Sequence, residues 1–180
     1  PERSFTQDNI ANSAGIYGGE EGITELTDGI AETLMKTVIK NAKILMTEPN
    51  NYDARDEIMW ASSLSHNGLT ACGGTGDWAS HQMEHEIGGM FDVAHGAGLA
   101  AIWGSWARYV YKDCPKRFSD FATKVMGVKA IQNGDKIDYE NTAIAGIEAL
   151  EQFFKDIKMP TCIRDLGISP SDEQIEEMAI

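Results

Sequence analysis

The amino-acid sequence predicts an all-α fold, a multi-helix bundle-like arrangement in a single domain. Apolar residues recur at three- and four-residue steps over long stretches, which is the period of helices with one buried face. Short segments rich in glycine, proline and asparagine separate these stretches and predict turns. No stretch has a persuasive two-residue alternation, so no strand is expected. A chain of 180 residues suits one domain of this kind.

The first part of the chain predicts two helices after an irregular start. Residues 1–20 are rich in glycine, asparagine and serine and are expected to be irregular. A long amphipathic helix is expected over residues 22–46, with lysines toward its carboxyl end, where cations suit the helix dipole. Its apolar stripe consists of Ile23, Leu26, Ile30, Leu34, Val38 and Leu45. Pro49 ends this segment, and Asn50 or Asn51 caps a second helix that extends to about residue 70.

The middle of the chain predicts a helix with weak points, followed by a strongly apolar one. Asp77 is a suitable N-cap, so a helix should begin near Trp78. The Gly88–Gly89 pair weakens this helix, and Asp92 offers a second break. The next helix follows His95 and continues to about residue 111, and its apolar residues surround it almost completely. Such a helix is expected to be buried on most sides.

The last third of the chain predicts three more helices. A short helix begins at Pro115 and is stopped by Gly127. Residues 128–137 then form a turn, and a clearly amphipathic helix covers residues 141–157. The final helix opens at Ser169-Pro170, a capping residue followed by a proline at the first helical position.

Three of the four histidines lie close together in the segment 76–100. His81 and His85 are four residues apart on the expected helix and therefore share one face. His95 lies just before or within the first turn of the following helix. Because the chain reverses between the two helices, three imidazoles can converge on one point, which is the geometry of a transition-metal site.

A pair of histidines at helical spacing has a simpler explanation that must be weighed against metal binding. Such pairs often lie on an exposed polar face or form hydrogen bonds within a core, and only the third histidine favours a metal site. The spacing is not the zinc signature in which glutamate follows the first histidine, because here Glu86 follows the second one, His85. Imidazole and carboxylate ligands suit several divalent metals, so the residue types do not select one.

The histidine segment resembles the metal-binding signature of the iron-containing alcohol dehydrogenases, most closely their butanol dehydrogenase branch. The segments 49–62 and 153–161 resemble the same branch, and the resemblance covers nearly the whole chain. It implies the helical carboxy-terminal domain of that family, which is dehydroquinate synthase-like in fold. It also implies that His81 and His95 bind the metal, whereas helical spacing alone would pair His81 with His85. By the same resemblance His85 lies near nicotinamide and substrate as a catalytic residue.

The cofactors implied by the resemblance are a divalent metal and NAD(P)H. Fe²⁺ is favoured over Zn²⁺, and NAD(P)H would be bound mainly by an amino-terminal nucleotide-binding domain that we expect to be missing here. The family also has an Asp-x-x-x-His pair upstream of the signature. No such pair precedes His81, because His66 is the only earlier histidine and Ser62 stands four residues before it. We therefore expect residues 1–180 to be a single metal-binding and catalytic domain truncated at its amino terminus, and to be inactive alone.

The activity implied is hydride transfer between NAD(P)H and a primary alcohol or aldehyde, with a homodimer as an expected assembly. Two alternatives stay open. A glycerol dehydrogenase-like enzyme would share the architecture and use zinc to oxidise a polyol. A non-enzymatic helical interaction module is suggested by the acidic composition and the missing catalytic residues.

Composition narrows the class of partner. The net charge of −13 argues against nucleic acid and anionic membranes as partners. The apolar runs are far shorter than a membrane span. The three cysteines, Cys72, Cys114 and Cys162, are widely spaced and form no CxxC motif, which is typical of reduced thiols in a cytoplasmic protein.

Overall fold

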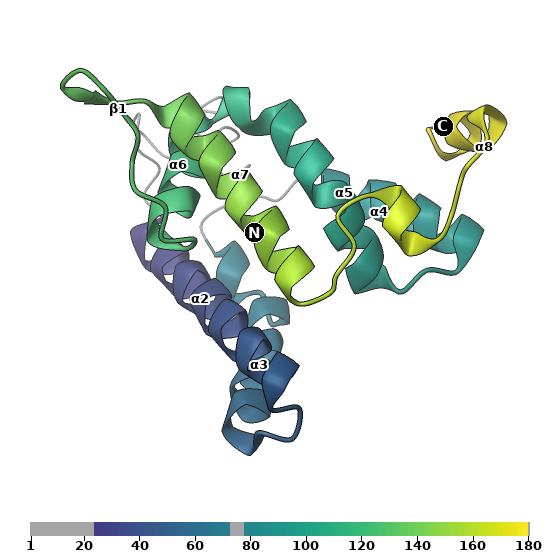
Figure 1. Cartoon of the computed structure of the whole chain (residues 1–180), viewed down its shortest axis with the longest axis horizontal. Coiled ribbons are helices and arrows are strands. Elements are labelled where there is room, and N and C mark those ends of the chain that lie inside the picture. Colours follow the sequence, from purple (N-terminus) through teal and green to yellow (C-terminus); the bar gives the residue numbers. More distant parts are fainter. Residues whose placement is uncertain (1–23, 73–77, 180) are drawn as a thin grey trace.

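The computed structural model describes residues 24–72 and 78–179, and within these ranges the fold is all-α apart from one short hairpin (Figure 1). The helices are α2 (Glu25–Thr47), α3 (Tyr52–His66), α4 (Ala79–Phe91), α5 (His95–Val110), α6 (Pro115–Lys124), α7 (Tyr139–Asp156) and α8 (Asp172–Met178). Three 3-10 turns, Leu69–Ala71, Tyr111–Asp113 and Ile163–Leu166, connect them. No described helix combines the length and the apolar character needed to cross a membrane.

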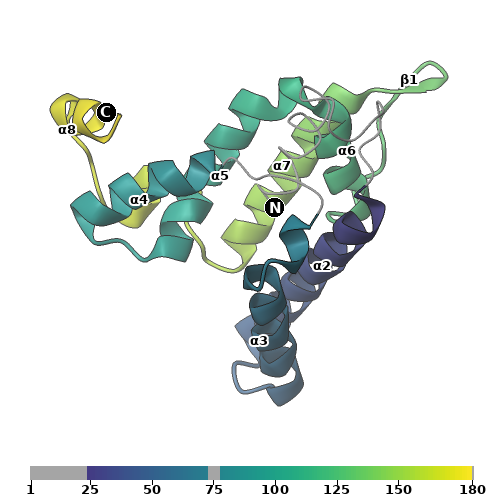
Figure 2. The same ribbon diagram turned by 180° about the vertical axis from the view of Figure 1, so that it is seen from behind.

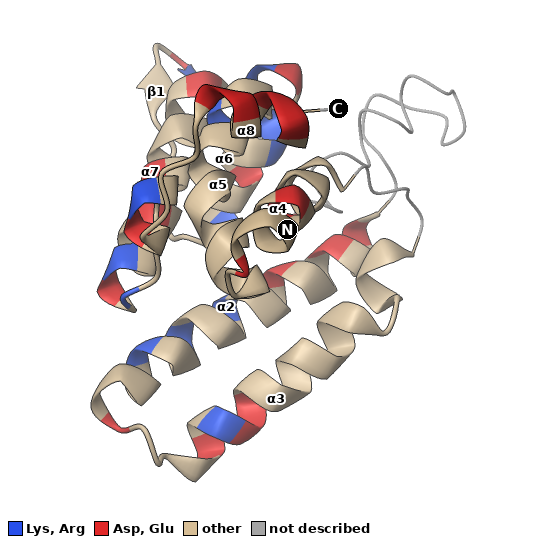
Figure 3. Cartoon of the chain, turned by 90° about the vertical axis from the view of Figure 1, so that its right-hand side faces the viewer, with Lys and Arg blue, Asp and Glu red and all other residues tan. Residues whose placement is uncertain are grey.

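The helices form two groups. The long helices α2 and α3 make an antiparallel pair, and α3 lies on the outer side of α2, away from the other helices (Figure 3). The helices α4, α5, α6 and α7 form the second group, with α8 at one end beside α4 (Figures 1 and 2). The lysines of α2 lie toward its carboxyl end, as the sequence predicts (Figure 3).

The hydrophobic core lies among α5, α6 and α7. Its aromatic residues from α5 and α6 are in contact, with the rings of Trp103 and Phe121 6.0 Å apart and those of Trp106 and Phe118 6.3 Å apart. Helix α7 contributes Ile147, which is completely buried. Eight residues of α5 are buried, which confirms the prediction that this helix is covered on most sides. The site described below therefore begins at the end of a well-packed helix.

Several predicted helix ends are confirmed. Asn51 caps α3, and its side chain accepts a hydrogen bond from the amide of Ala54 at 3.0 Å. Pro115 occupies the first turn of α6, and Gly127 follows that helix with a positive φ of 73°. Asp92, the second predicted break, adopts a left-handed conformation and ends α4. The proposed cap Asp77 lies outside the described residues.

Other predictions about the helix ends were wrong. The second helix stops at His66, several residues early, because Gly68 adopts a positive φ of 90°. Helix α7 starts at Tyr139, since the Asp138 side chain caps it by accepting from the amide of Asn141 at 3.0 Å. This hydrogen bond is also the main reason why the pKa of Asp138 is lowered.

The last helix and the expected turn also differ from the prediction. Helix α8 is capped by Ser171 in a capping box with Gln174, and not by Ser169 followed by Pro170. The expected turn at 128–137 contains an antiparallel hairpin, β1 (Gln132–Asn133) and β2 (Lys136–Ile137). Both differences are local, because each concerns residues on the surface.

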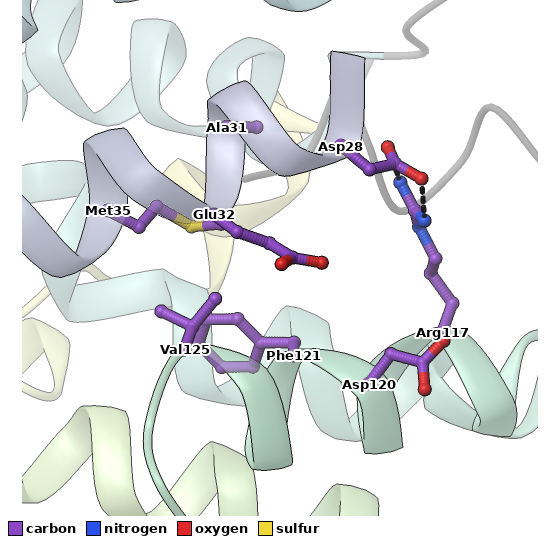
Figure 4. A pocket seen from close by; sticks show the side chains of 8 residues that line it. All are labelled: Asp28, Ala31, Glu32, Met35, Arg117, Asp120, Phe121 and Val125. Carbon is purple, nitrogen blue, oxygen red and sulfur yellow. Dashed lines mark hydrogen bonds and ion pairs between the residues drawn. The ribbon is translucent and has the colours of Figure 1, made fainter. Parts of the chain in front are cut away.

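An ion pair between distant parts of the chain joins the two helix groups. Arg117 of α6 forms two hydrogen bonds with the carboxylate of Asp28 in α2, and their side chains are only 13% and 14% exposed (Figure 4). Glu32 lies one turn further along α2 and pairs with Lys124 at 3.4 Å. Asp28, Glu32 and Arg117 line a small cavity of about 20 Å³ between α2 and α6, large enough for about one water molecule.

We expect Asp28→Ala to lower the free energy of unfolding by about 2–4 kcal/mol, because it removes one partner of a largely buried ion pair and leaves the guanidinium charge buried. Chemical denaturation followed by tryptophan fluorescence measures the change. The control is Asp156→Ala, which breaks the exposed Asp156–Lys43 pair of 3.6 Å and should cost less than about 1 kcal/mol. Equal losses from both variants would contradict the role of Asp28 in holding α2 against α6.

Candidate metal centre

The chain reversal between α4 and α5 builds the site. Helix α4 ends at Phe91, and the left-handed Asp92, whose amide donates to the carbonyl of Gly88 at 2.9 Å, turns the chain back. Helix α5 then begins with His95 as its first residue. The Gly88–Gly89 pair does not interrupt α4. As a result, the first turn of α5 lies against the histidine face of α4.

This reversal brings the three predicted histidines together. The ring of His95 lies 5.5 Å from that of His81 and 5.3 Å from that of His85, between centroids. The rings of His81 and His85 are farther from each other, at 6.5 Å, and nearly perpendicular. His95 is therefore close to both histidines of α4. The remaining histidine, His66, ends α3, where its Nδ1 lies 3.0 Å from the carbonyl oxygen of Ser62.

The three histidines differ in their surroundings. His81 is half-buried and has the ring of Trp78 edge-on at 4.9 Å between centroids. His85 is exposed, and the side chain of His95 is 52% exposed. One side of the cluster thus faces the protein and the other is open, which leaves room for further ligands or a substrate.

Glu84 also belongs to this cluster, although sequence reasoning did not find it. It is 1% exposed, and its Oε2 contacts Nδ1 of His95. Possible ligand atoms of Glu84, His85 and His95 lie within 4.8 Å of one another, the one group of this kind among the described residues. A faint signal exists in the sequence, since Gly88 stands four residues after Glu84 on the same helix face and leaves space for its side chain.

The geometry and the family resemblance indicate different metal ligands. The geometry groups Glu84 with His85 and His95, whereas the resemblance implies His81 and His95. Glu84 is the least suitable ligand of these, because its carboxylate is already engaged by His95 Nδ1 and lies deep between the helices. Imidazole donors with a carboxylate behind them fit a divalent transition metal.

The opposite side of α4 borders an apolar groove of about 750 Å³. Met83 and Ile87 line it from α4, roughly half a turn of helix away from the histidines. Its other lining residues are Ala101, Ile102, Ser105, Trp106, Tyr109, Cys162, Ile163 and Arg164. Trp106 lines this groove and also belongs to the hydrophobic core.

Comparisons with known proteins agree with this architecture. The family model described as "Fe-containing alcohol dehydrogenase family, C-terminal" matches residues 20–180. NADH-dependent butanol dehydrogenase A of Clostridium acetobutylicum is 35% identical over 164 residues, which are 91% of this chain and 40% of that protein. NADPH-dependent aldehyde reductase YqhD of Escherichia coli is 30% identical over 152 residues, 82% of this chain and 36% of that protein.

A solved structure is similar as well. The crystal structure of NADH-dependent butanol dehydrogenase A from Thermotoga maritima has a TM-score of 0.76 and 34% identity, and the match covers 86% of this chain and 37% of that one. The chain thus spans about two fifths of the length of the relatives that it matches. The family model matches most of the chain, and the helical fold agrees with that of a solved member. This chain therefore belongs to the iron-containing alcohol dehydrogenase family and corresponds to the carboxy-terminal domain of that family.

Proposed function

We propose that this chain is the metal-binding part of an NAD(P)-dependent dehydrogenase that interconverts primary alcohols and aldehydes, of the butanol dehydrogenase type. The observation that carries the proposal is the convergence of His81, His85 and His95 where α4 meets α5. Relatives named NADH-dependent butanol dehydrogenases support the type of activity. They also favour this branch over a glycerol dehydrogenase-like enzyme.

In this proposal His81 and His95 hold a divalent metal, Fe²⁺ in preference to Zn²⁺. Their rings are 5.5 Å apart and come from different helices, so one ion between them would also tie α4 to α5. Such a metal supplies Lewis-acid chemistry, which polarises a carbonyl oxygen or lowers the pKa of an alcohol. The two imidazoles do not complete a coordination shell, so the remaining ligands would come from an Asp-x-x-x-His pair outside residues 1–180.

His85 is assigned the catalytic role. It lies one helical turn from His81, is exposed, and has its ring 5.3 Å from that of His95. An exposed imidazole beside the metal ligands can orient a substrate hydroxyl or exchange its proton with water. The nicotinamide cofactor would be held mainly by a separate nucleotide-binding domain. We further propose a cytoplasmic location and a homodimer, and expect residues 1–180 alone to be inactive.

Replacing His81 and His85 in turn separates the two roles. We expect His81→Ala to lose metal, while His85→Ala keeps the metal and lowers kcat by about 100- to 10,000-fold, the range typical of a lost general acid or base. Elemental analysis and calorimetric titration of the intact protein measure the metal, and NADH- or NADPH-dependent reduction of butanal measures activity. If His85→Ala lost metal to the same extent as His81→Ala, the ligands would instead be His81 and His85, the pair that lies four residues apart on α4.

A further inference from the structure

The carboxylate of Glu84 is buried, and a buried carboxylate needs a specific partner. It is 1% exposed, whereas Glu86, two residues further along the same helix, is exposed. A buried carboxylate without a partner is costly, so burial of this kind points to a defined interaction. The partner here is His95, whose Nδ1 contacts Oε2 of Glu84.

The contact determines which nitrogen of His95 is available. A carboxylate accepts hydrogen bonds, so Nδ1 of His95 is the nitrogen that carries the hydrogen and donates it. The lone pair of the neutral ring is then on Nε2, at the far side of the imidazole from Glu84. An imidazole held in this way is oriented in the manner of metal-ligating histidines, which commonly donate their other N–H to a carboxylate.

Two glycines make the space that Glu84 occupies. A Cβ at Gly98 would lie 2.5 Å from Oε1 and 2.7 Å from Cγ of Glu84, and one at Gly88 would lie 3.1 Å from Oε1. Gly98 follows His95 by three residues and therefore lies on the same side of α5. A side chain at position 98 would have to displace the carboxylate. The close approach of Glu84 to α5 thus depends on glycine at this position.

We propose that Glu84 is a positioning residue for His95: it accepts the hydrogen bond from Nδ1 and thereby presents Nε2 to the metal. The inference rests on the proposed function and deepens it, since it gives His95 an orienting partner within the chain. It also gives Gly98 a role, which is to admit the Glu84 side chain. The competing arrangement is one in which Glu84 itself coordinates the metal.

Two substitutions at Glu84 distinguish these arrangements. Leucine keeps roughly the same volume without an acceptor, and glutamine keeps an acceptor oxygen without the charge. We expect Glu84→Leu to weaken Co²⁺ and Zn²⁺ binding by the intact protein about 10- to 100-fold, as for other partners of metal-ligating histidines. Glu84→Gln should show about half of that loss on a logarithmic scale, because a neutral hydrogen bond is about half as strong as a charge-assisted one. The exposed Glu86→Gln is the matched control and should not change affinity.

Chelator competition measures the affinities, and the visible spectrum of bound Co²⁺ reports the number of ligands. The proposal requires an unchanged spectral intensity in both Glu84 variants. A loss in Glu84→Gln as large as in Glu84→Leu, with a changed spectrum, would make Glu84 a direct ligand and overturn the proposal. Unchanged affinity in Glu84→Leu would overturn it as well. If replacing His81 or His95 in the otherwise unsubstituted protein left the metal affinity unchanged, the proposed function itself would be overturned.

A second pair of variants tests the inference without changing Glu84. Gly98→Ala should weaken metal binding in the same direction as Glu84→Leu, because the added methyl group displaces the carboxylate. Gly96→Ala is the control, since it lies on the same helix turn and its Cβ would meet no atom within 4 Å. Far-ultraviolet circular dichroism confirms that each variant is folded. Equal affinities of Gly98→Ala and Gly96→Ala would contradict the proposed role of the glycine.

Discussion

Replacement of His95 by alanine is expected to abolish metal binding at working concentrations, and with it the proposed dehydrogenase activity of the intact protein with its nucleotide-binding domain. His95 is the histidine that lies close to both His81 and His85, at 5.5 Å and 5.3 Å between ring centroids. Tight zinc sites with four ligands bind with about 10–16 kcal/mol, so one ligand's share of roughly 3 kcal/mol corresponds to a loss of about 100-fold in affinity. The same substitution should also lower the free energy of unfolding, because the Glu84 carboxylate would stay buried without its imidazole partner.

The matched control for His95→Ala is His66→Ala. His66 is exposed at the end of α3, and its Nδ1 is directed to the backbone of its own helix. Its removal should leave metal content and kcat/KM unchanged. Metal content is measured by elemental analysis after dialysis, and activity is measured with saturating metal added back. An active, metal-containing His95→Ala variant would refute the assignment of His95 as a ligand.

The histidine cluster could be predicted from the sequence because it depends on local rules. Two residues four apart on a helix share a face, and Asp92 marks the reversal that returns His95 to that face. Glu84 could not be predicted in this way. Its burial depends on the approach of α5, and on the absence of a side chain at Gly98, which comes from a different helix. Gly88, one helical turn after Glu84, leaves room for its side chain but does not predict the contact with α5.

The helices themselves were largely predictable, since apolar periodicity extends over many residues. The 22–46 prediction corresponds to α2, yet Leu26, placed on the buried stripe, is 79% exposed. Asp28 faces α6 through its ion pair with Arg117, and a residue two positions away points about 200° around the helix. A charged pair between distant segments thus sets the rotation of α2 at its start, which the apolar pattern alone does not reveal.

The ends of the last two helices were mispredicted for a different reason. Asp138 and Ser171 cap α7 and α8, and each accepts a hydrogen bond from the amide three residues later. Other polar residues able to cap a helix lie near the start of each of these helices, for example Asn141 and Ser169, so residue type alone leaves several choices. The choice depends on where the chain leaves the preceding turn, which the fold determines.

Replacement of Gly146 by alanine is expected to be the most damaging small substitution in the core. Gly146 lies where α7 crosses α6, and an added Cβ would be 2.4 Å from Cβ and 2.8 Å from Cα of Ala122. The nearest atoms include backbone, so no rotation of a side chain relieves the contact and the two helices must separate. Because Phe118 and Ile147 are completely buried beside this crossing, separation would also loosen the core. Overpacking of this kind costs about 1–3 kcal/mol, and we expect the upper end.

Replacement of Gly29 by alanine should instead raise the free energy of unfolding. Gly29 lies within α2 and a Cβ there would meet no atom within 4 Å, so alanine should stabilise the protein by about 0.5–1 kcal/mol through its better helix propensity. Chemical denaturation followed by tryptophan fluorescence measures both changes, since Trp103 and Trp106 lie in the affected core. The loss from Gly146→Ala should shrink on an Ala122→Gly background, which removes one of the two close atoms. If Gly146→Ala stabilised the protein as Gly29→Ala should, α6 and α7 would not cross at this close distance. The described packing of the core that supports α5 would then be wrong.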